Sequence, residues 1–230
     1  MFLECSEITF RYPTGSTDVF HRLSLRVKTP GFHALFGPSG VGKTSLARII
    51  VGDITDYSGV VRSDGMKHLL YTYNMERLPD WSSVGKHLEK ITPPSLMERK
   101  NELIASFEMT QTMKLRFSQL SLGQQNRVNL IRYLLQDFHL LIMDESLANV
   151  DERTREKIIL RLKDMFPETC FLYISHNVIE VSKFCREILV YSNPSEQKGY
   201  SLIRGRDYRT GYSLDRKDLD STLLEIMNAF

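Results

Sequence analysis

Residues 37–44 read Gly37-Pro38-Ser39-Gly40-Val41-Gly42-Lys43-Thr44. The stretch fits the pattern G-x-x-x-x-G-K-[ST], which is typical of loops that bind the phosphates of nucleoside triphosphates. Its glycines let consecutive backbone N–H groups turn inward around a phosphate, because a Cβ would block the turn or the approach. The Lys43 ammonium is suited to the β- and γ-phosphates, and the Thr44 hydroxyl is suited to Mg²⁺. The pattern therefore predicts a nucleotide-binding loop.

The sequence on both sides of the loop supports this interpretation. An apolar run at 32–36 predicts a buried strand before the loop, and residues 45–51 predict a helix after it. The positive N-terminal end of such a helix favours a bound anion, so we expect Ser45 to share in nucleotide binding. The alternative is a chance match to the pattern, but a chance match would not be expected to have a strand before it and a helix after it.

The composition limits the class of protein. The chain has 230 residues, enough for one large domain or one domain with a subdomain. A hydrophobic share of 42% and a charged share of 25% are typical of a soluble globular domain. The 30 basic and 28 acidic residues nearly balance, and the sequence contains no basic patch. We therefore expect no nucleic-acid partner.

Cysteine content and hydropathy predict the compartment. Cys5, Cys170 and Cys185 are too scattered for a disulfide framework or a zinc site, which favours reduced thiols in the cytosol. The first residues lack the features of a signal peptide. No apolar run approaches the ~20 residues that a membrane-spanning helix needs. We expect a cytoplasmic protein that does not span a membrane by itself.

The pattern along the chain predicts an α/β fold with a mostly parallel sheet. Residues 3–11 and 20–27 indicate an antiparallel pair at the N-terminus. Later strands are expected at 59–62, 69–73, 138–143, 170–174 and 188–191. Helices are expected at 153–166 and 219–227. Strands that alternate with helices favour a parallel sheet covered on both faces.

Between residues 75 and 136 apolar positions recur at helical spacing, which indicates a helical insert. We therefore expect one domain over 1–230, with a nucleotide-binding core at 1–74 and 137–192. Residues 75–136 would form a helical subdomain, and residues 193–230 a C-terminal extension.

A second candidate for the site is the run His139-Leu140-Leu141-Ile142-Met143-Asp144-Glu145. It predicts a buried strand that ends in two carboxylates. A strand that merely reaches solvent at acidic residues is the alternative. Downstream of a phosphate-binding loop, however, Asp144 is suited to hold Mg²⁺, and Glu145 to orient or deprotonate the attacking water.

Residues 120–127 narrow the class further. They read Leu-Ser-Leu-Gly-Gln-Gln-Asn-Arg and start an expected helix, with Ser121 as its N-cap. This stretch is similar to the LSGGQ signature of ABC ATPases. On these residues, the chain resembles an importer-like ATP-binding subunit of an ABC transporter, over residues 1 to about 192. The resemblance implies the ABC ATPase fold, a P-loop core with an N-terminal antiparallel β subdomain and an α-helical insert.

The resemblance also implies roles for single residues, with ATP and Mg²⁺ as ligands. Tyr12 matches the aromatic that stacks on adenine, and residues 37–44 match the Walker A loop. Asp144 and Glu145 match the Walker B pair with its catalytic glutamate, and His176 the switch histidine that contacts the γ-phosphate. The remaining implied residues are catalytic Lys43; metal-binding Thr44 and Asn74; and, from a second subunit, nucleotide-binding Ser121, Gly123, Gln124 and Asp151 of the D-loop.

Three positions depart from the family pattern. Asn74 stands where the family has glutamine, and its side chain reaches about 1.5 Å less. Leu122 replaces the first glycine of the signature, while Ser121 and Gly123 keep the hydroxyl and the close backbone approach. Ser146 stands where proline is frequent, and we expect a slightly looser turn there.

The resemblance implies an ATPase subunit that drives solute transport, with import favoured because no membrane domain is fused. The partners would be a second ATPase subunit, membrane permease subunits and, in an importer, a substrate-binding protein. The subunit would lie on the cytoplasmic face of the cell membrane. The region around Trp81 is similar to that of subunits that import nitrate, sulfonates or taurine. One alternative is a nucleotide-gated interaction module with slow or no turnover. Another is a nucleic-acid or ribosome-associated ATPase, which would carry a long coiled coil, tandem ATPase domains or a basic arm.

Overall fold

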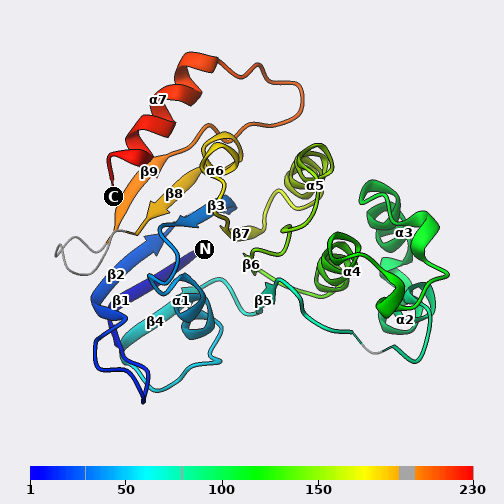
Figure 1. Cartoon of the computed structure of the whole chain (residues 1–230), viewed down its shortest axis with the longest axis horizontal. Helices are drawn as coiled ribbons and strands as arrows, with labels where there is room; N and C mark the ends of the chain where they lie inside the picture. Colours follow the sequence, from blue (N-terminus) through cyan, green and yellow to red (C-terminus); the bar gives the residue numbers. More distant parts are fainter. Residues whose placement is uncertain (29, 79, 192–199, 230) are drawn as a thin grey trace. The chain divides into compact units, whose positions relative to one another are not determined.

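The computed structural model describes residues 1–28, 30–78, 80–191 and 200–229 (Figure 1). The chain forms two compact units, and each is described by itself below. The first unit comprises residues 1–71, 138–144 and 166–230. The second comprises residues 72–137 and 145–165. Residues 193–199 and 230 of the expected C-terminal extension lie outside the described part of the chain.

The first unit begins with a three-stranded antiparallel sheet. Its order is β2 (Phe20–Val27), β1 (Phe2–Phe10) and β4 (Ser58–Asp64). Along the C-terminal half of β2, buried Leu23 and Leu25 alternate with exposed side chains. This period of two is the pattern of a sheet that buries one face.

The second sheet of the chain has six strands and carries the phosphate-binding loop. Its order is β5 (Leu69–Tyr73), β6 (Leu140–Asp144), β7 (Cys170–Ile174), β3 (Gly31–Phe36), β8 (Glu187–Val190) and β9 (Ser201–Arg204). The pairs β6–β7, β7–β3 and β3–β8 are parallel, and β9 runs antiparallel to β8. Every residue of β6 and β7 is buried, as expected for central strands of a covered parallel sheet.

The parallel strands decide where the site lies. The phosphate-binding loop follows β3 and leads into α1 (Lys43–Ile50), Asp144 is the last residue of β6, and His176 follows β7. Because β3, β6 and β7 run parallel, their carboxyl ends lie at the same edge of the sheet. Ligands of open α/β sheets bind at this edge.

The second unit is helical. It contains α2 (Val84–Ile91), α3 (Met97–Ser106), α4 (Leu122–Leu134) and α5 (Glu152–Met165). Three short 3₁₀ segments lie at Pro94–Leu96, Thr110–Thr112 and Phe117–Gln119. Helix α3 packs against α4 and α5. The core of the helical unit includes the fully buried side chains Leu88, Leu103, Phe107, Met109 and Leu130.

The chain returns to the sheet unit at its C-terminal end. Helix α7 (Arg216–Met227) packs against β9 and α6 (Val178–Phe184) (Figure 1). The segment before α7 is tied to α6 by its backbone. The N–H groups of Arg206 and Tyr208 donate to the carbonyl oxygens of Ser182 and Lys183, at 2.9 Å each.

The predicted fold class is confirmed: a mostly parallel sheet, an N-terminal antiparallel sheet and a helical insert. Expected strands at 69–73 and 170–174 have the predicted bounds. Two elements were not predicted, α6 and β9, because seven and four residues are too short to show a period. The structure also groups residues 145–165 with the helical unit, whereas the expected core had included them.

The buried centre of β6 gives a test of the fold. Ile142→Ala should lower the free energy of unfolding by about 2–5 kcal/mol, because Ile142 is fully buried and its truncation leaves a cavity. Val60→Ala is the control, since Val60 on β4 is 46% exposed and its truncation should cost less than about 1 kcal/mol. Urea unfolding measures both, and equal losses would contradict the assigned core.

Candidate functional site

The loop between β3 and α1 has a shape that requires glycine at its end. Gly42 is the N-cap of α1 and has φ +97°, in the left-handed region. A Cβ on Gly42 would lie 2.5 Å from Val19 Cγ1 and 2.7 Å from Phe20 Cζ. Both the backbone conformation and the space therefore exclude a side chain here.

Lys43 directs its ammonium group into the loop. Nζ donates to the carbonyl oxygens of Gly37 and Pro38, at 2.8 Å each, and the side chain is buried. These bonds hold a positive charge among the loop's backbone groups, at the N-terminal end of α1. Such an arrangement is suited to phosphate.

A hydroxyl and a carboxylate meet beside the loop. Thr44 Oγ1 donates to Asp144 Oδ2 at 2.6 Å, and the Tyr71 hydroxyl donates to the same oxygen at 2.9 Å. Among the described residues there is no cluster of three or more His, Cys, Asp or Glu side chains able to hold a metal. Hydroxyl and carboxylate oxygens are, however, the hard donors that Mg²⁺ takes alongside water and substrate phosphates. Thr44 and Asp144 therefore fit the ion that the sequence implies. The contact of Tyr71 was not predicted.

Tyr12 lies next to the start of α1. Its hydroxyl is 2.8 Å from Ser45 Oγ, and its ring contacts Phe10 edge to face with centroids 4.8 Å apart. The Tyr12 side chain is partly exposed, so a ring face remains accessible for stacking. The structure thus brings the predicted Tyr12 close to the predicted Ser45.

His176 is exposed on a turn that a buried carboxylate organises. The hydroxyls of Tyr173 and Ser175 each donate to Glu180 Oε2 at 3.0 Å, and the Asn177 N–H donates to Ser175 Oγ at 3.1 Å. Glu180 is buried, so its hydrogen bonds fix the backbone on both sides of His176. Sequence reasoning missed Glu180, whose only local signal is its place in the first turn of α6.

Glu145 begins a tight turn in the helical unit. It is partly exposed and has φ +51°, a conformation that is strained for a residue other than glycine. The next residue, Ser146, is buried and donates its hydroxyl to the Thr72 carbonyl oxygen at 2.9 Å. This hydrogen bond anchors the turn at Ser146, a contact that the sequence did not predict, and the expectation of a slightly looser turn there stays a prediction.

The signature residues form the start of α4. Ser121 is the N-cap, as predicted: its hydroxyl accepts from the Gln124 N–H at 3.3 Å. The Gln124 side chain accepts from the Ser121 N–H at 2.9 Å, which completes a capping box. Leu122, which stands in place of the first signature glycine, is 45% exposed, so its side chain does not have to fit into the packed interior.

Gly123 shows why this helix needs a glycine. A Cβ there would lie 2.2 Å from the Asn149 carbonyl oxygen. The close backbone approach is thus made to the loop at residues 147–151 of the same chain. That loop ends at Asp151, whose carboxylate accepts from the Thr154 N–H at 3.0 Å. These hydrogen bonds from Thr154 lower the pKa of Asp151, so its charge caps α5.

Asn74 also has a partner within the helical unit. Its Oδ1 accepts from Asn126 Nδ2 at 2.9 Å. Asn126 was not predicted as a site residue, because a buried polar side chain at helical spacing has no local signal.

The predicted residues fall into both units. The sheet unit contains Tyr12, the loop 37–45, Asp144 and His176, and it brings Tyr12 to Ser45 and Thr44 to Asp144. The helical unit contains the others: Asn74, Ser121, Gly123, Gln124, Glu145 and Asp151. The structure brings Gly123 to the loop that ends at Asp151.

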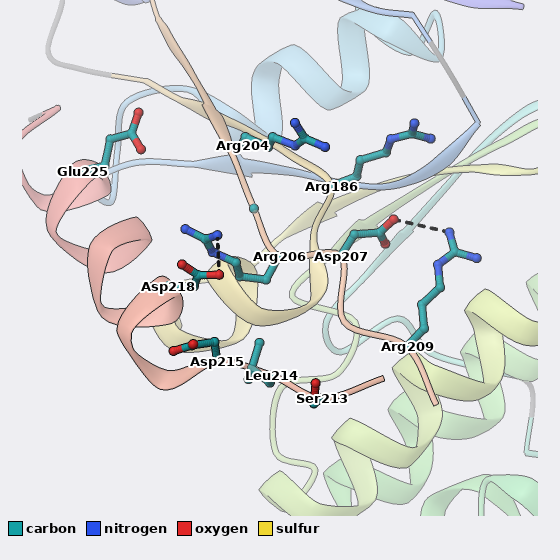
Figure 2. A pocket seen from close by; sticks show the side chains of 11 residues that line it. Arg186, Arg204, Arg206, Asp207, Arg209, Ser213, Leu214, Asp215, Asp218 and Glu225 are labelled. Carbon is teal, nitrogen blue, oxygen red and sulfur yellow. Dashed lines mark hydrogen bonds and ion pairs between the residues drawn. The ribbon is translucent and has the colours of Figure 1, made fainter. Parts of the chain in front are cut away.

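A separate pocket of about 700 Å³ lies in the sheet unit near β9 and α7. Figure 2 shows two ion pairs in it, Arg206 with Asp218 and Arg209 with Asp207. Its charged side chains are balanced, with arginines 186, 204, 206 and 209 against Asp207, Asp215, Asp218 and Glu225. It contains no residue of the phosphate-binding loop and no excess of positive charge for a triphosphate.

The glycine at the end of the loop can be tested against a matched glycine. Gly42→Ala should lower the melting temperature further than Gly52→Ala. Both positions have left-handed φ, +97° and +85°, but nothing lies within 4 Å of a Cβ at Gly52. Gly52→Ala should cost about 1–2 kcal/mol from the backbone alone, and Gly42→Ala about 3 kcal/mol or more. Equal melting temperatures would contradict the steric contact with Val19 and Phe20.

Among the described residues, none of the helices combines the length and apolarity needed to cross a membrane. The comparisons with known proteins give a consistent assignment. The family model described as "ABC transporter" matches residues 20–148, more than half of the chain.

The chain is similar to proteins named for import. It is 28% identical to the taurine import ATP-binding protein TauB of Pseudomonas fluorescens, over 97% of this chain and 90% of that protein. It is 29% identical to the spermidine/putrescine import ATP-binding protein PotA of Thermotoga maritima, over 71% of this chain. That match spans about half the relative's length, 49%.

A solved structure entitled "Structure of ATP binding subunit of ABC transporter" shares the fold. Its TM-score is 0.78 at 18% sequence identity, over 99% of this chain and all of the other. The chain therefore belongs to the ABC transporter family, among that family's ATP-binding subunits.

Proposed function

We propose that the chain binds ATP with Mg²⁺, hydrolyses it between two copies of the subunit, and drives solute import through separate membrane subunits. The observation that carries this proposal is the 2.6 Å hydrogen bond between Thr44 and Asp144. It joins the phosphate-binding loop to the carboxylate at the end of β6. A hydroxyl and a carboxylate placed together beside a glycine-rich loop are the protein's share of a Mg-nucleotide site.

Nucleotide binding follows from the loop. The backbone N–H groups of residues 39–44 and the Lys43 ammonium would hold the β- and γ-phosphates, with Tyr12 stacking on adenine. Lys43 would exchange its bonds to the Gly37 and Pro38 carbonyls for phosphate oxygens. The exchange replaces neutral acceptors with charged ones, which strengthens the hydrogen bonds.

Thr44 and Asp144 would hold the Mg²⁺ ion, with Asn74 as the third predicted residue. The bound ion supplies neutralisation of phosphate charge. The residues themselves supply oriented oxygens: Asp144 is fixed by the two hydroxyls of Thr44 and Tyr71, which limits its side chain to one orientation.

For hydrolysis, we assign the proton acceptor to Glu145. Its carboxylate would orient the attacking water and take its proton as the water oxygen bonds to the γ-phosphorus. The bond from the γ-phosphorus to the β–γ bridging oxygen would break in the same step, with ADP as the leaving group. His176 would donate a hydrogen bond to the γ-phosphate from the turn that Glu180 fixes. His176 is exposed and Glu145 is partly exposed.

A second subunit would complete the site. The N-terminal turn of α4 presents Ser121, Gly123 and Gln124, and a helix N-terminus favours a γ-phosphate. In the proposed homodimer this turn and Asp151 would face the nucleotide of the other copy. The capping box would then open, because Ser121 and Gln124 would bind phosphate or water.

The helical unit is the proposed contact to the membrane subunits. Three large apolar side chains near Asn74 are exposed: Tyr73 at 45%, Met75 at 59% and Trp81 at 78%. We propose that these side chains contribute to the contact, because apolar patches on a protein surface mark interaction sites. The relatives named for import support the direction of transport. We further propose a substrate-binding protein as a partner and a place on the cytoplasmic face of the membrane.

The role of Glu145 gives the first test. Glu145→Gln should keep ATP affinity but lower the hydrolysis rate by at least about 100-fold, because the amide cannot take the proton. The variant should accumulate as a dimer in ATP and Mg²⁺, measured by light scattering. Glu152→Gln on α5 is the control and should hydrolyse normally. A Glu145→Gln variant that hydrolysed ATP at the parent's rate would disprove the assignment.

The loop lysine gives the second test. Lys43→Ala should weaken ATP binding at least about tenfold, because the charge within the loop is lost. Lys157→Ala removes an exposed lysine that pairs with Glu108, and it should leave affinity unchanged. Calorimetry with ATP and Mg²⁺ measures both. Tight binding by the parent without turnover would favour a nucleotide-gated interaction module over a motor.

A further inference from the structure

Asn126 connects two separate segments of the helical unit. Its Nδ2 donates to Asn74 Oδ1 at 2.9 Å and to the Ala148 carbonyl oxygen at 2.7 Å. Its Oδ1 accepts from the Met75 N–H at 3.4 Å. The side chain is 3% exposed, and both of its amide hydrogens are used. One buried amide thus binds the turn at 74–75 and the loop at 147–151.

We infer that Asn126 is a positioning residue, which keeps Asn74 and the 147–151 loop in register with the signature helix α4. The inference rests on the proposed function, in which these three segments meet nucleotide. Asn126 itself would touch neither nucleotide nor metal. Through Asn126, a displacement of Asn74 would also displace the 147–151 loop.

The hydrogen bonds of Asn126 explain how a movement of Asn74 is coupled to the loop. If Asn74 moves away alone, an amide hydrogen of Asn126 stays buried without an acceptor, which is costly. The cost is avoided if α4 and the loop move with Asn74. Asn74 is one methylene shorter than glutamine, so reaching a ligand beside the γ-phosphate would require movement of its backbone. Asn126 would pass that movement on.

A second contact ties α4 to the same loop. Gly123 and Asn126 are three residues apart and share one face of the helix. Gly123 lies against the Asn149 carbonyl, and Asn126 binds the Ala148 carbonyl. The helix thus contacts two successive peptide groups, so the loop cannot slide along α4 without breaking one contact.

Both segments held by Asn126 contain a left-handed residue. Met75 has φ +64° and Asn149 has φ +62°. This conformation is unfavourable for methionine and is retained only where surrounding contacts impose it. The bond from the Met75 N–H to Asn126 is one such contact. The turn that follows Asn74 therefore depends on the same side chain as the loop.

Asn129 provides the matched comparison. It lies one turn further along α4, it is also buried, and its Nδ2 also donates to a backbone carbonyl, that of Glu76 at 2.6 Å. Unlike Asn126, it makes no side-chain hydrogen bond to the 147–151 loop among the residues that the structure describes. If Asn126 had only a structural role as a buried amide, replacing either asparagine should have the same effect on hydrolysis.

A double-mutant cycle tests the coupling in the full-length chain. Asn126→Ala and Asn74→Ala should each lower kcat at least about tenfold while KM for ATP stays within about twofold. The double variant should be no slower than the slower single variant. Asn129→Ala should lower the melting temperature about as much as Asn126→Ala, but its effect on kcat should be small and should multiply with that of Asn74→Ala. Multiplicative effects of Asn126→Ala and Asn74→Ala would overturn the inference.

Hydrogen exchange gives a readout that does not depend on turnover. Without nucleotide, Asn126→Ala should speed exchange in peptides covering both 72–78 and 145–151, and Asn129→Ala only in the first. Unchanged exchange at 145–151 would overturn the inference even if the enzyme were active. Conversely, a parent chain that neither bound nor hydrolysed ATP would disprove the proposed function and leave the exchange result to decide the coupling. If Asn126→Ala does not fold, Asn126→Leu keeps the branched shape and the number of side-chain heavy atoms, removes both donors and is read in the same way.

Discussion

The hydrogen bond between Thr44 and Asp144 is the contact on which the proposed chemistry depends. It joins the first residues of α1 to the end of β6, two segments that the parallel sheet brings to one edge. The loop that Gly42 makes possible places Lys43 beside it. The site that we propose for a Mg-nucleotide therefore depends on ordinary packing and hydrogen bonding: buried parallel strands, a glycine without room for a Cβ, and two polar side chains.

The helical unit has a comparable centre at α4. Its first turn is capped by Ser121 and Gln124, its glycine lies against the Asn149 carbonyl, and its next turn carries Asn126. These contacts link the signature helix to the turn after β5 and to the loop before α5. If two copies close around nucleotide, each helix would bring with it the segments that it holds, and hydrolysis would release them together. That sequence of events would convert loss of the γ-phosphate into movement at the exposed surface near Trp81.

Much of this could be predicted from sequence because the deciding features are local. The loop is eight consecutive residues, and Asp144 follows an apolar run that must be a strand. The contacts of Asn126 and Tyr71 could not be predicted, since their partners lie far away in the sequence and are brought close by tertiary packing. Those of Glu180 were missed although Ser175 lies only five residues before it, because the short helix α6 itself was not predicted. Strand β9 was missed because four residues are too few to show a clear alternation of apolar and polar side chains, and β-propensity alone is a weak signal. The hydrogen bond from the Ser146 hydroxyl to the Thr72 carbonyl was not predicted for the same reason as the contacts of Asn126 and Tyr71, since the two residues lie far apart in the sequence.

The central claim is that two copies of this chain form one hydrolytic site. The most direct test is the rate of ATP hydrolysis by the purified chain with Mg²⁺, measured over a wide range of protein concentration together with its molar mass. If two copies form one site, the specific activity should rise with protein concentration as monomers become dimers and should then level off. A specific activity that stayed constant while the protein remained monomeric throughout would contradict it.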